Sequence, residues 1–419
     1  MSSPDGAGGA RPRSRLRGLA FSVLALGLGV VLLELTLQGL SAFVPGVSGL
    51  LLVEGGGRPT DPRRIPDERI GERPNPDWFD HDARGFRNDE ALERAAVVAL
   101  GDSQTYGTGV DGAEAWPAVL GKGLGEPAYN MGFPGYGPAQ MLLLLEDALA
   151  LEPRVVVAAM YAGNDLYDAY KLVHVDRLGD ALGGPSEAER AAIDAAEAET
   201  SLVDSVMVAY ANRRVGLRGV LSRRCRIYGL LRATQRAFED KPDPAAREAA
   251  RTDWGLLTAR AAARPGRYAA FEDERFKTLF TPGYRALAVQ LDDPRIREGE
   301  RLCLESIARM AELASEADAR LVALFVPTKE YVFAELEREA PAGGETYRKL
   351  VADEERLWSE ARAFLEERDV AIADGVRALR APLDRGEQPY PMDHDGHPNA
   401  LGQRALAEEV QRVIEGLGD

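Results

Sequence analysis

The sequence predicts an α/β protein in which a parallel sheet is covered by helices. Short apolar runs bounded by polar or glycine residues are typical of buried parallel strands. Three such runs occur, at Ala95–Leu100, Arg154–Met160 and Arg320–Val326. Apolar residues recur at helical spacing before the third run (Cys303, Ile307, Met310, Ala314) and near the C-terminus (Leu406, Val410, Ile414), where Asn399 is a suitable N-cap. Strands that alternate with helices in this way predict a parallel sheet.

The composition limits the classes of partner. The 419 residues are 45% hydrophobic and 28% charged, enough to bury a core as one large domain with an insertion or as two smaller domains. The formal net charge is -16. Because nucleic-acid binding depends on positive charge, no nucleic-acid partner is expected, and a neutral or cationic substrate fits better. The two cysteines, Cys225 and Cys303, are predicted to be structural, or to form at most one bridge.

The N-terminal region predicts a membrane anchor. Residues 18–43 contain one ionisable residue, Glu34, and are long enough to cross a bilayer as a helix. Arginines at positions 11, 13, 15 and 17 predict that residues 1–17 form a cytoplasmic tail. Everything after about Val44 would then lie outside a single-pass inner (cytoplasmic) membrane protein. The alternative is a cleaved signal peptide, whose apolar core is usually only about 7 to 15 residues. For Glu34 we expect a solvated or helix-paired carboxylate.

The remaining chain divides into a stem and one large domain. Many glycines and prolines between residues 44 and 90 predict an extracytoplasmic stem and a segment that leads into the domain. Residues 91–419 form the predicted domain. Its segment from about 170 to 291 has no strong strand pattern and contains a capping-box sequence from Ser186 to Glu189, which predicts a mostly helical, lid-like insertion.

A serine follows the first apolar run directly. Ser103 lies in the sequence GDSQTYG, where it would stand at the carboxyl edge of the sheet. Open α/β folds bind ligands at this edge, and the backbone N–H groups of the turn point to where an oxyanion would form. A short Gly-Asp-Ser turn also arises by chance, so a purely structural turn is the alternative on this segment alone.

Three later segments supply the other parts of acyl chemistry. Gly135, in NMGFPGYG, allows close approach of its backbone N–H to a substrate, because it has no side chain. Asn164, in GND after the second apolar run, has a carboxamide that can donate a hydrogen bond. His397, in DHDGHPN, has carboxylates beside it. A serine, two oxyanion donors and a histidine with an aspartate are what acyl transfer requires.

These four segments resemble, in order, the signature blocks of the SGNH hydrolase superfamily, also called GDSL lipases and esterases. The resemblance covers about residues 95–414, with the insertion unmatched. It implies a three-layer α/β/α, flavodoxin-like fold, with Ser103 as nucleophile and His397 as general base. It also implies an oxyanion hole made by Ser103, Gly135 and Asn164. Gly135 is chosen over Gly132 because the family glycine usually follows the block's asparagine by five residues.

Two further stretches resemble bacterial SGNH proteins that carry an N-terminal membrane helix. They are Arg84–Asn88, ahead of the first apolar run, and Val326–Glu330, after the third. A packed loop and a strand end are the simplest interpretation of them. Lys329 would nevertheless lie on the active-site edge of the sheet.

The acid that partners the histidine departs from the usual family spacing. Three residues before His397, where the superfamily usually has aspartate, the chain has His394. We assign Asp395 to orient His397 and rank Asp393 second, and a serine–histidine dyad is the third alternative. Carboxylates and imidazoles also bind divalent metals, but no second cluster at ligand spacing supports a metal site.

The expected activity is cleavage or transfer of an ester-linked acyl group, without a cofactor. Cell-envelope carbohydrate is the leading substrate class, because an anchored outer domain has envelope glycan and lipid within reach. The motifs do not distinguish a hydrolase from an O-acyltransferase, nor do they identify protein partners. A catalytically silent binding or assembly subunit of an envelope polysaccharide system is the alternative function.

Overall fold

The computed structural model describes residues 12–43, 61–179, 183–211, 225–227, 244–336 and 344–418. The chain divides into two compact units, Met1–Asp61 with Arg213–Lys241, and Pro62–Asn212 with Pro242–Asp419. The first contains the predicted anchor, and the second contains all four signature blocks. Residues 44–60 of the stem and entry segment predicted at 44–90, and the first eleven residues of the predicted tail, lie outside the described residues.

The first unit contains the long helix α1, Pro12–Phe43, which includes the predicted membrane segment 18–43. Many of its large apolar residues are exposed. Phe21 and Leu24, for example, have exposed fractions of 74% and 70%. Among the described residues, we find no helix with the length and hydropathy needed to span a membrane. The Glu34 carboxylate accepts hydrogen bonds from the backbone N–H groups of Arg226 (2.7 Å) and Ile227 (2.9 Å), so it is paired within its unit.

The second unit is built on a parallel sheet, as the sequence predicts. Its strands are β3 (Val97–Leu100), β4 (Ala128–Asn130), β5 (Val155–Tyr161), β8 (Arg320–Val326) and β9 (Ala371–Asp374). All neighbours pair in parallel, in the order β4-β3-β5-β8-β9. Numbered by their place in the chain this order is 2-1-3-4-5, that of flavodoxin-like folds. The strand order changes direction between β3 and β5, and folds of this kind bind ligands beyond the carboxyl ends of the strands at such a point.

Helices cover both faces of this sheet. They are α3 (Ser103–Tyr106), α4 (Trp116–Leu124), α5 (Pro138–Leu149), α6 (Asp165–Tyr170), α14 (Pro294–Glu316), α15 (Lys329–Val332), α16 (Gly344–Glu366), α17 (Gly375–Asp384) and α18 (Ala400–Gly416), with a short 3₁₀ turn at Gly112–Glu114. Asn399 caps α18 by accepting the N–H of Gly402, as predicted.

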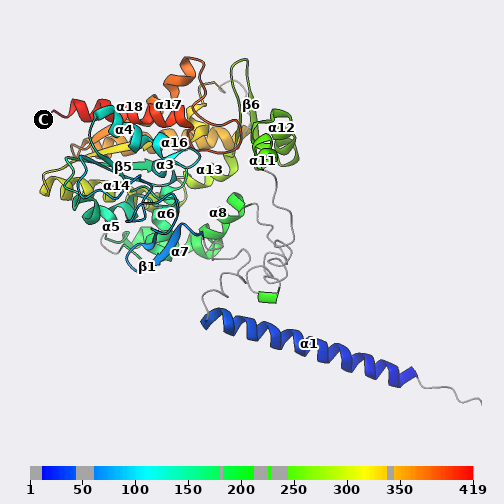
Figure 1. Ribbon diagram of the computed structural model, residues 1–419. Helices are drawn as coiled ribbons and strands as arrows, with labels where there is room; N and C mark the ends of the chain where they lie inside the picture. The colour runs from blue at the N-terminus through cyan, green and yellow to red at the C-terminus, as the bar shows by residue number, and fades with distance from the viewer. Residues whose placement is uncertain are drawn as a thin grey trace, which may run out of the picture. The chain divides into compact units, whose positions relative to one another are not determined.

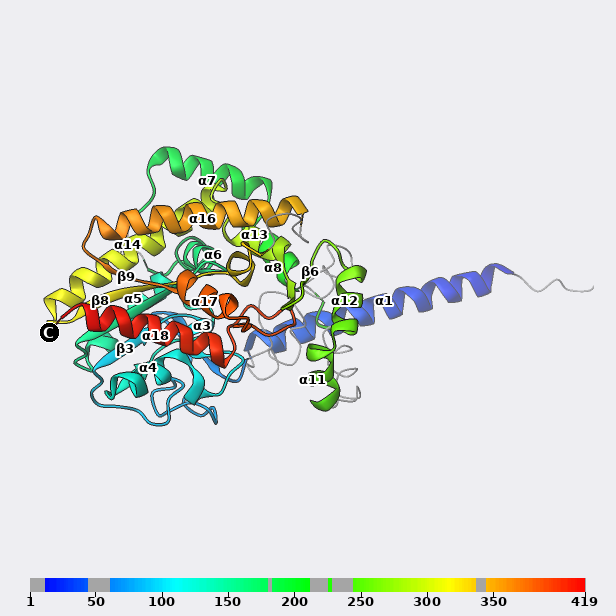
Figure 2. The same cartoon turned by 90° about the horizontal axis from the view of Figure 1, so that it is seen from above.

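Each face of the sheet has its own core, because successive strand residues point to opposite sides. Val98 and Leu100 pack into the core formed with α5, α14 and α16. Val97 and Ala99 pack into the core formed with α4, α17 and α18. Figures 1 and 2 show α14 on one side of the sheet and α4 and α18 on the other. The result is a three-layer α/β/α arrangement.

The segment from about 170 to 291 is mostly helical where it is described. It contains a π-helical turn (Lys171–Val175), α7 (Glu187–Glu199), α8 (Leu202–Ala211), α11 (Pro244–Thr252), α12 (Trp254–Ala263) and α13 (Pro282–Ala288). The capping box predicted at Ser186 and Glu189 is present at the start of α7.

The same segment also contains a hairpin that the sequence analysis did not predict. Strands β6 (Ala269–Glu272) and β7 (Lys277–Phe280) pair antiparallel. Their turn is fixed by Asp273, whose carboxylate accepts the N–H groups of Arg275 and Phe276. With only four residues each, these strands are too short to give a clear alternating pattern.

The segment that leads into the domain is part of its fold. It begins with a two-stranded hairpin, β1 (Arg64–Asp67) and β2 (Gly71–Pro74). Its later residues contact the nucleophile and glycine blocks: Arg87 donates to the carbonyl of Gly107 (2.8 Å), and Asn88 donates to that of Asn130 (3.1 Å). The RGFRN stretch therefore packs beside the candidate site. Both cysteines are free thiols, and Cys303 is buried in α14.

Helix α14 packs closely on α6 through Gly299. A Cβ added at Gly299 would lie 1.9 Å from the backbone carbonyl oxygen of Leu166. We therefore predict that Gly299→Ala lowers the free energy of unfolding by about 1–3 kcal/mol, the usual cost of overpacking. Urea unfolding measures the change. Gly416→Ala is the control, because a Cβ there has no neighbour within 4 Å. Equal stability of the two variants would contradict the predicted contact.

Candidate active site

The nucleophile block forms a tight turn at the end of β3. Ser103 is the first residue of α3, and Asp102 before it caps the helix by accepting the N–H of Gln104 at 2.8 Å. Asp102 is fully buried, and burial raises the pKa of its carboxyl, whereas hydrogen bonds from Gln104, Ser103 and Asn164 act in the opposite direction. The serine is therefore held at the carboxyl edge of the sheet by a buried acidic cap.

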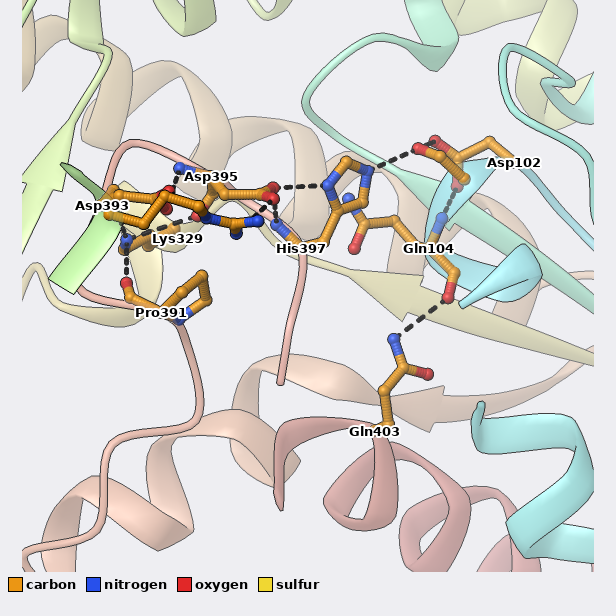
Figure 3. Close-up of polar contacts among 10 residues, drawn as sticks. Asp102, Gln104, Lys329, Pro391, Asp393, Asp395, His397 and Gln403 are labelled. Carbon is orange, nitrogen blue, oxygen red and sulfur yellow. Dashed lines mark hydrogen bonds and ion pairs between the residues drawn. The ribbon is translucent and has the colours of Figure 1, made fainter. Parts of the chain in front are cut away.

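Ser103, His397 and Asp395 form a continuous chain of hydrogen bonds. The Ser103 Oγ and His397 Nε2 atoms are 2.8 Å apart. His397 Nδ1 lies 2.6 Å from Asp395 Oδ1, which also accepts the His397 backbone N–H at 3.1 Å. This geometry suits a ring that donates from Nδ1 to the carboxylate and accepts the serine hydroxyl at Nε2. Figure 3 shows the imidazole of His397 between Asp395 and the turn that contains Asp102.

The electrostatics of this chain favour a charged Asp395. Burial raises the pKa of the Asp395 carboxyl, but hydrogen bonds from His397 and the nearby charges of His397 and Arg251 outweigh it and hold the pKa well below its ordinary value. An ionised carboxylate beside Nδ1 stabilises the imidazolium that forms when the histidine takes a proton.

Asp393 has a different environment from Asp395. Its side chain is buried, with Oδ1 accepting the Asp395 N–H at 3.0 Å and Oδ2 accepting Arg251 Nε at 2.8 Å. Within the described part of the chain, Asp393 makes no hydrogen bond to His397. His394 contacts the ring of Tyr268 edge-on, with the ring centroids 5.3 Å apart. Arg251 also donates to Asp395, at 3.4 Å. The described residues contain no group of three or more His, Cys, Asp or Glu able to hold a metal.

The two predicted oxyanion donors lie on loops beside the nucleophile turn. The glycine block is tied to it by the Phe133 N–H, which donates to the Gly101 carbonyl at 2.9 Å. Gly135 has φ +87°, a conformation that favours glycine. Asn164 is the N-cap of α6, at the end of β5. Its carboxamide donates to Asp168 at 2.7 Å, so in this structure the donor is engaged by a carboxylate.

Sequence reasoning missed several residues that hold these loops in place. Gln403 in α18 donates to the Gln104 carbonyl at 3.3 Å and accepts the Trp116 N–H at 2.9 Å, which connects α18 to the nucleophile turn (Figure 3). Arg285 in α13 is buried and donates to the Gly163 carbonyl at 3.0 Å. A Cβ on Gly396 would lie 2.7 Å from Arg285 Nη2, so Arg285 also packs against the histidine block. No local sequence pattern marks either residue.

A parallel sheet of order 2-1-3-4-5 with a serine–histidine–aspartate chain at its switch point is an arrangement known from serine hydrolases. Residues 99–293 match the model of the GDSL-like lipase/acylhydrolase family. The match includes Ser103, Gly135 and Asn164, and it ends before His397.

Three solved structures illustrate the similarity. A GDSL-like lipase from Bacteroides thetaiotaomicron is 13% identical, with 78% of this chain and 89% of that chain covered and a TM-score of 0.32. An extracellular lipase from Streptomyces rimosus is 13% identical (76% and 98% covered, TM-score 0.33). Phospholipase A1 from Streptomyces albidoflavus is 10% identical (77% and 99% covered, TM-score 0.35). No curated protein matches the sequence.

Proposed function

We propose that this protein is a serine esterase or O-acyltransferase that acts on ester-linked acyl groups, with Ser103, His397 and Asp395 as its catalytic residues. The observation that carries the proposal is the continuous hydrogen-bonded chain from Ser103 Oγ through His397 to Asp395. A silent binding subunit would have no need for a serine hydroxyl 2.8 Å from a histidine that is itself oriented by a carboxylate.

In the proposed reaction, Ser103 Oγ attacks the ester carbonyl while His397 Nε2 accepts the hydroxyl proton. The tetrahedral intermediate collapses to an acyl-serine, and His397 returns the proton to the leaving alcohol. Water, or a second hydroxyl, then attacks the acyl-serine by the same steps in reverse. The backbone N–H groups of Ser103 and Gly135 and the Asn164 carboxamide would stabilise the oxyanion. For this, Asn164 would turn toward the oxyanion one of its two N–H groups, which donate to Asp165 and Asp168 in the structure.

We further propose that residues 18–43, which lie in α1, anchor the enzyme in the inner membrane, with the catalytic domain outside and envelope carbohydrate esters as substrates. The support is the uninterrupted helix Pro12–Phe43, its exposed apolar side chains and the arginines that precede its apolar part. This location places envelope glycan and lipid within reach of Ser103.

Removal of the nucleophile tests the activity. Ser103→Ala should fold normally, because one partly buried hydroxyl contributes little to packing, yet lose turnover of small acyl esters by about 10⁵- to 10⁶-fold. The wild type, but not the variant, should gain the mass of a fluorophosphonate probe in intact-mass spectrometry. A wild type that neither cleaves esters nor reacts with the probe would favour the silent binding subunit.

Two substitutions in one loop test which carboxylate serves the histidine. Asp395→Asn should lower kcat by about 10⁴-fold, because the oriented carboxylate next to Nδ1 is lost. Asp393→Asn should lower it by at most about tenfold, because Asn can still accept the Asp395 N–H and only the pair with the half-exposed Arg251 is weakened. The reverse order would identify Asp393 as the acid, and two active variants would indicate a serine–histidine dyad.

The topology has its own test. In cells that express the full chain, protease added to spheroplasts should degrade the catalytic domain, because the arginines hold the N-terminus in the cytoplasm. A version that lacks residues 1–43 should be released from the membrane fraction. Protection of the domain in intact spheroplasts, or a natural mature form without residues 1–43, would exclude the anchor.

A further inference from the structure

Lys329 is a buried lysine beneath the loop that carries the proposed catalytic acid and base. It follows β8 through Val326-Pro327-Thr328, and its side chain is only 1% exposed. Its ammonium donates to three backbone carbonyls of one loop: Pro391 (2.7 Å), Asp393 (2.7 Å) and Asp395 (3.3 Å). Figure 3 shows the dashed contacts that connect Lys329 to Pro391 and to this loop.

The number of these contacts equals the number of N–H donors on a lysine ammonium. An ammonium has three N–H donors and no acceptor, so three carbonyls satisfy it completely. Burial lowers the pKa of Lys329 to about 8, although the carboxylates of Glu330, Asp393 and Asp395 oppose the shift and Arg285 adds to it. Since about 8 is above neutral pH, the ammonium keeps its charge there. A fully satisfied buried cation is costly to replace by a group with fewer donors.

Lys329 is itself held rigidly from the other side. Thr328 donates from its N–H and hydroxyl to the buried Glu354 carboxylate of α16, at 2.8 and 2.5 Å. Glu330 accepts the Thr281 N–H at 2.7 Å, which ties α15 to the start of α13. The residues on both sides of Lys329 are thus fixed to different helices. A rigid support is what a group needs in order to position a loop that has no regular structure of its own.

We propose that Lys329 is a positioning residue that holds the Pro391–His397 loop so that Asp395 meets Nδ1 of His397. The inference rests on the proposed function, because it assigns Lys329 a role in that same site. Short turns also shape the loop, in which Asp393 accepts the Asp395 N–H and Asp395 accepts the His397 N–H. Outside the loop, Arg251 and the Leu279 N–H contact it as well. These turns shape the loop locally, whereas Lys329 ties its carbonyls to the edge of the sheet.

The test replaces the ammonium but keeps the apolar stem, in Lys329→Met. We expect kcat for a small ester to fall by about 10- to 100-fold, as a displacement of about 1 Å in a catalytic group does, with KM changed by less than about threefold. The matched control is Lys122→Met, because Lys122 in α4 donates to a single carbonyl, that of Ala113, at an exposed position. The control should keep wild-type kcat.

A second measurement does not depend on activity. Hydrogen–deuterium exchange of the peptide that covers residues 391–397 should be faster in Lys329→Met by roughly tenfold, the size expected for loss of hydrogen bonds to a charged group. Exchange in β5 and β8 should stay unchanged. Unaltered exchange in this loop would overturn the proposal even if kcat fell. Faster exchange in a protein whose wild type has no ester activity would support the positioning role and refute the proposed function alone.

Lys329→Gln keeps the proposal testable if the methionine variant does not fold. Glutamine retains two N–H donors but is one atom shorter and neutral, so it cannot satisfy three carbonyls. We expect kcat and loop exchange between those of the wild type and those predicted for the methionine variant. A folded Lys329→Gln with wild-type kcat and wild-type exchange of residues 391–397 would overturn the positioning role.

Discussion

The hydrogen bond between Ser103 and His397 joins residues 294 positions apart, and the rest of the site is arranged around it. Neither residue lies inside a long helix or strand. Ser103 follows β3, and His397 lies in the loop before α18. A contact of this kind requires two loops to be held to within a few tenths of an ångström, so the surrounding structure must fix both backbones. Gln403 does this directly, since it connects the first turn of α18 to the backbone at Gln104.

Much of the fold follows from sequence patterns because the sheet is buried on both faces. The runs at Ala95–Leu100, Arg154–Met160 and Arg320–Val326 each contain one of the three central strands, β3, β5 and β8. The outer strands β4 (AYN) and β9 (AIAD) do not lie in a long apolar run and give no comparable signal. The hairpin β6–β7 was missed for the same reason. The length of the uninterrupted apolar run, rather than of the strand itself, separates the predicted strands from the others, because β3 also has only four residues but lies in an apolar run of six.

The site shows a similar division. The residues with a proposed chemical role lie in short motifs in loops next to strands and helices. The sequence was therefore enough to predict that Ser103, Asn164 and His397 lie at one edge of the sheet. The sequence could not show that Asn164 donates to Asp168, because this depends on the side-chain arrangement within the first turn of α6. It also gave no indication of Arg285 or Gln403, whose positions depend on helices far along the chain. Lys329 was placed at the correct edge, but its bonds to three carbonyls come from tertiary packing.

Two cations contact the loop with the acid, and burial decides how much each contributes. Arg251 from α11 has a half-exposed side chain, so solvent screens its pairs with Asp393 and Asp395. This screening makes the two pairs weaker than they would be if Arg251 were buried. Lys329 is buried and its partners are backbone carbonyls, so removal of its ammonium would leave buried acceptors unpaired, which typically costs about 1–3 kcal/mol. The β7 backbone adds a further tie, because the Leu279 N–H donates to the Met392 carbonyl at 3.0 Å. The loop therefore depends on the edge of the sheet and on β7 more than on α11, and α11 can move with a smaller effect on the acid and the base.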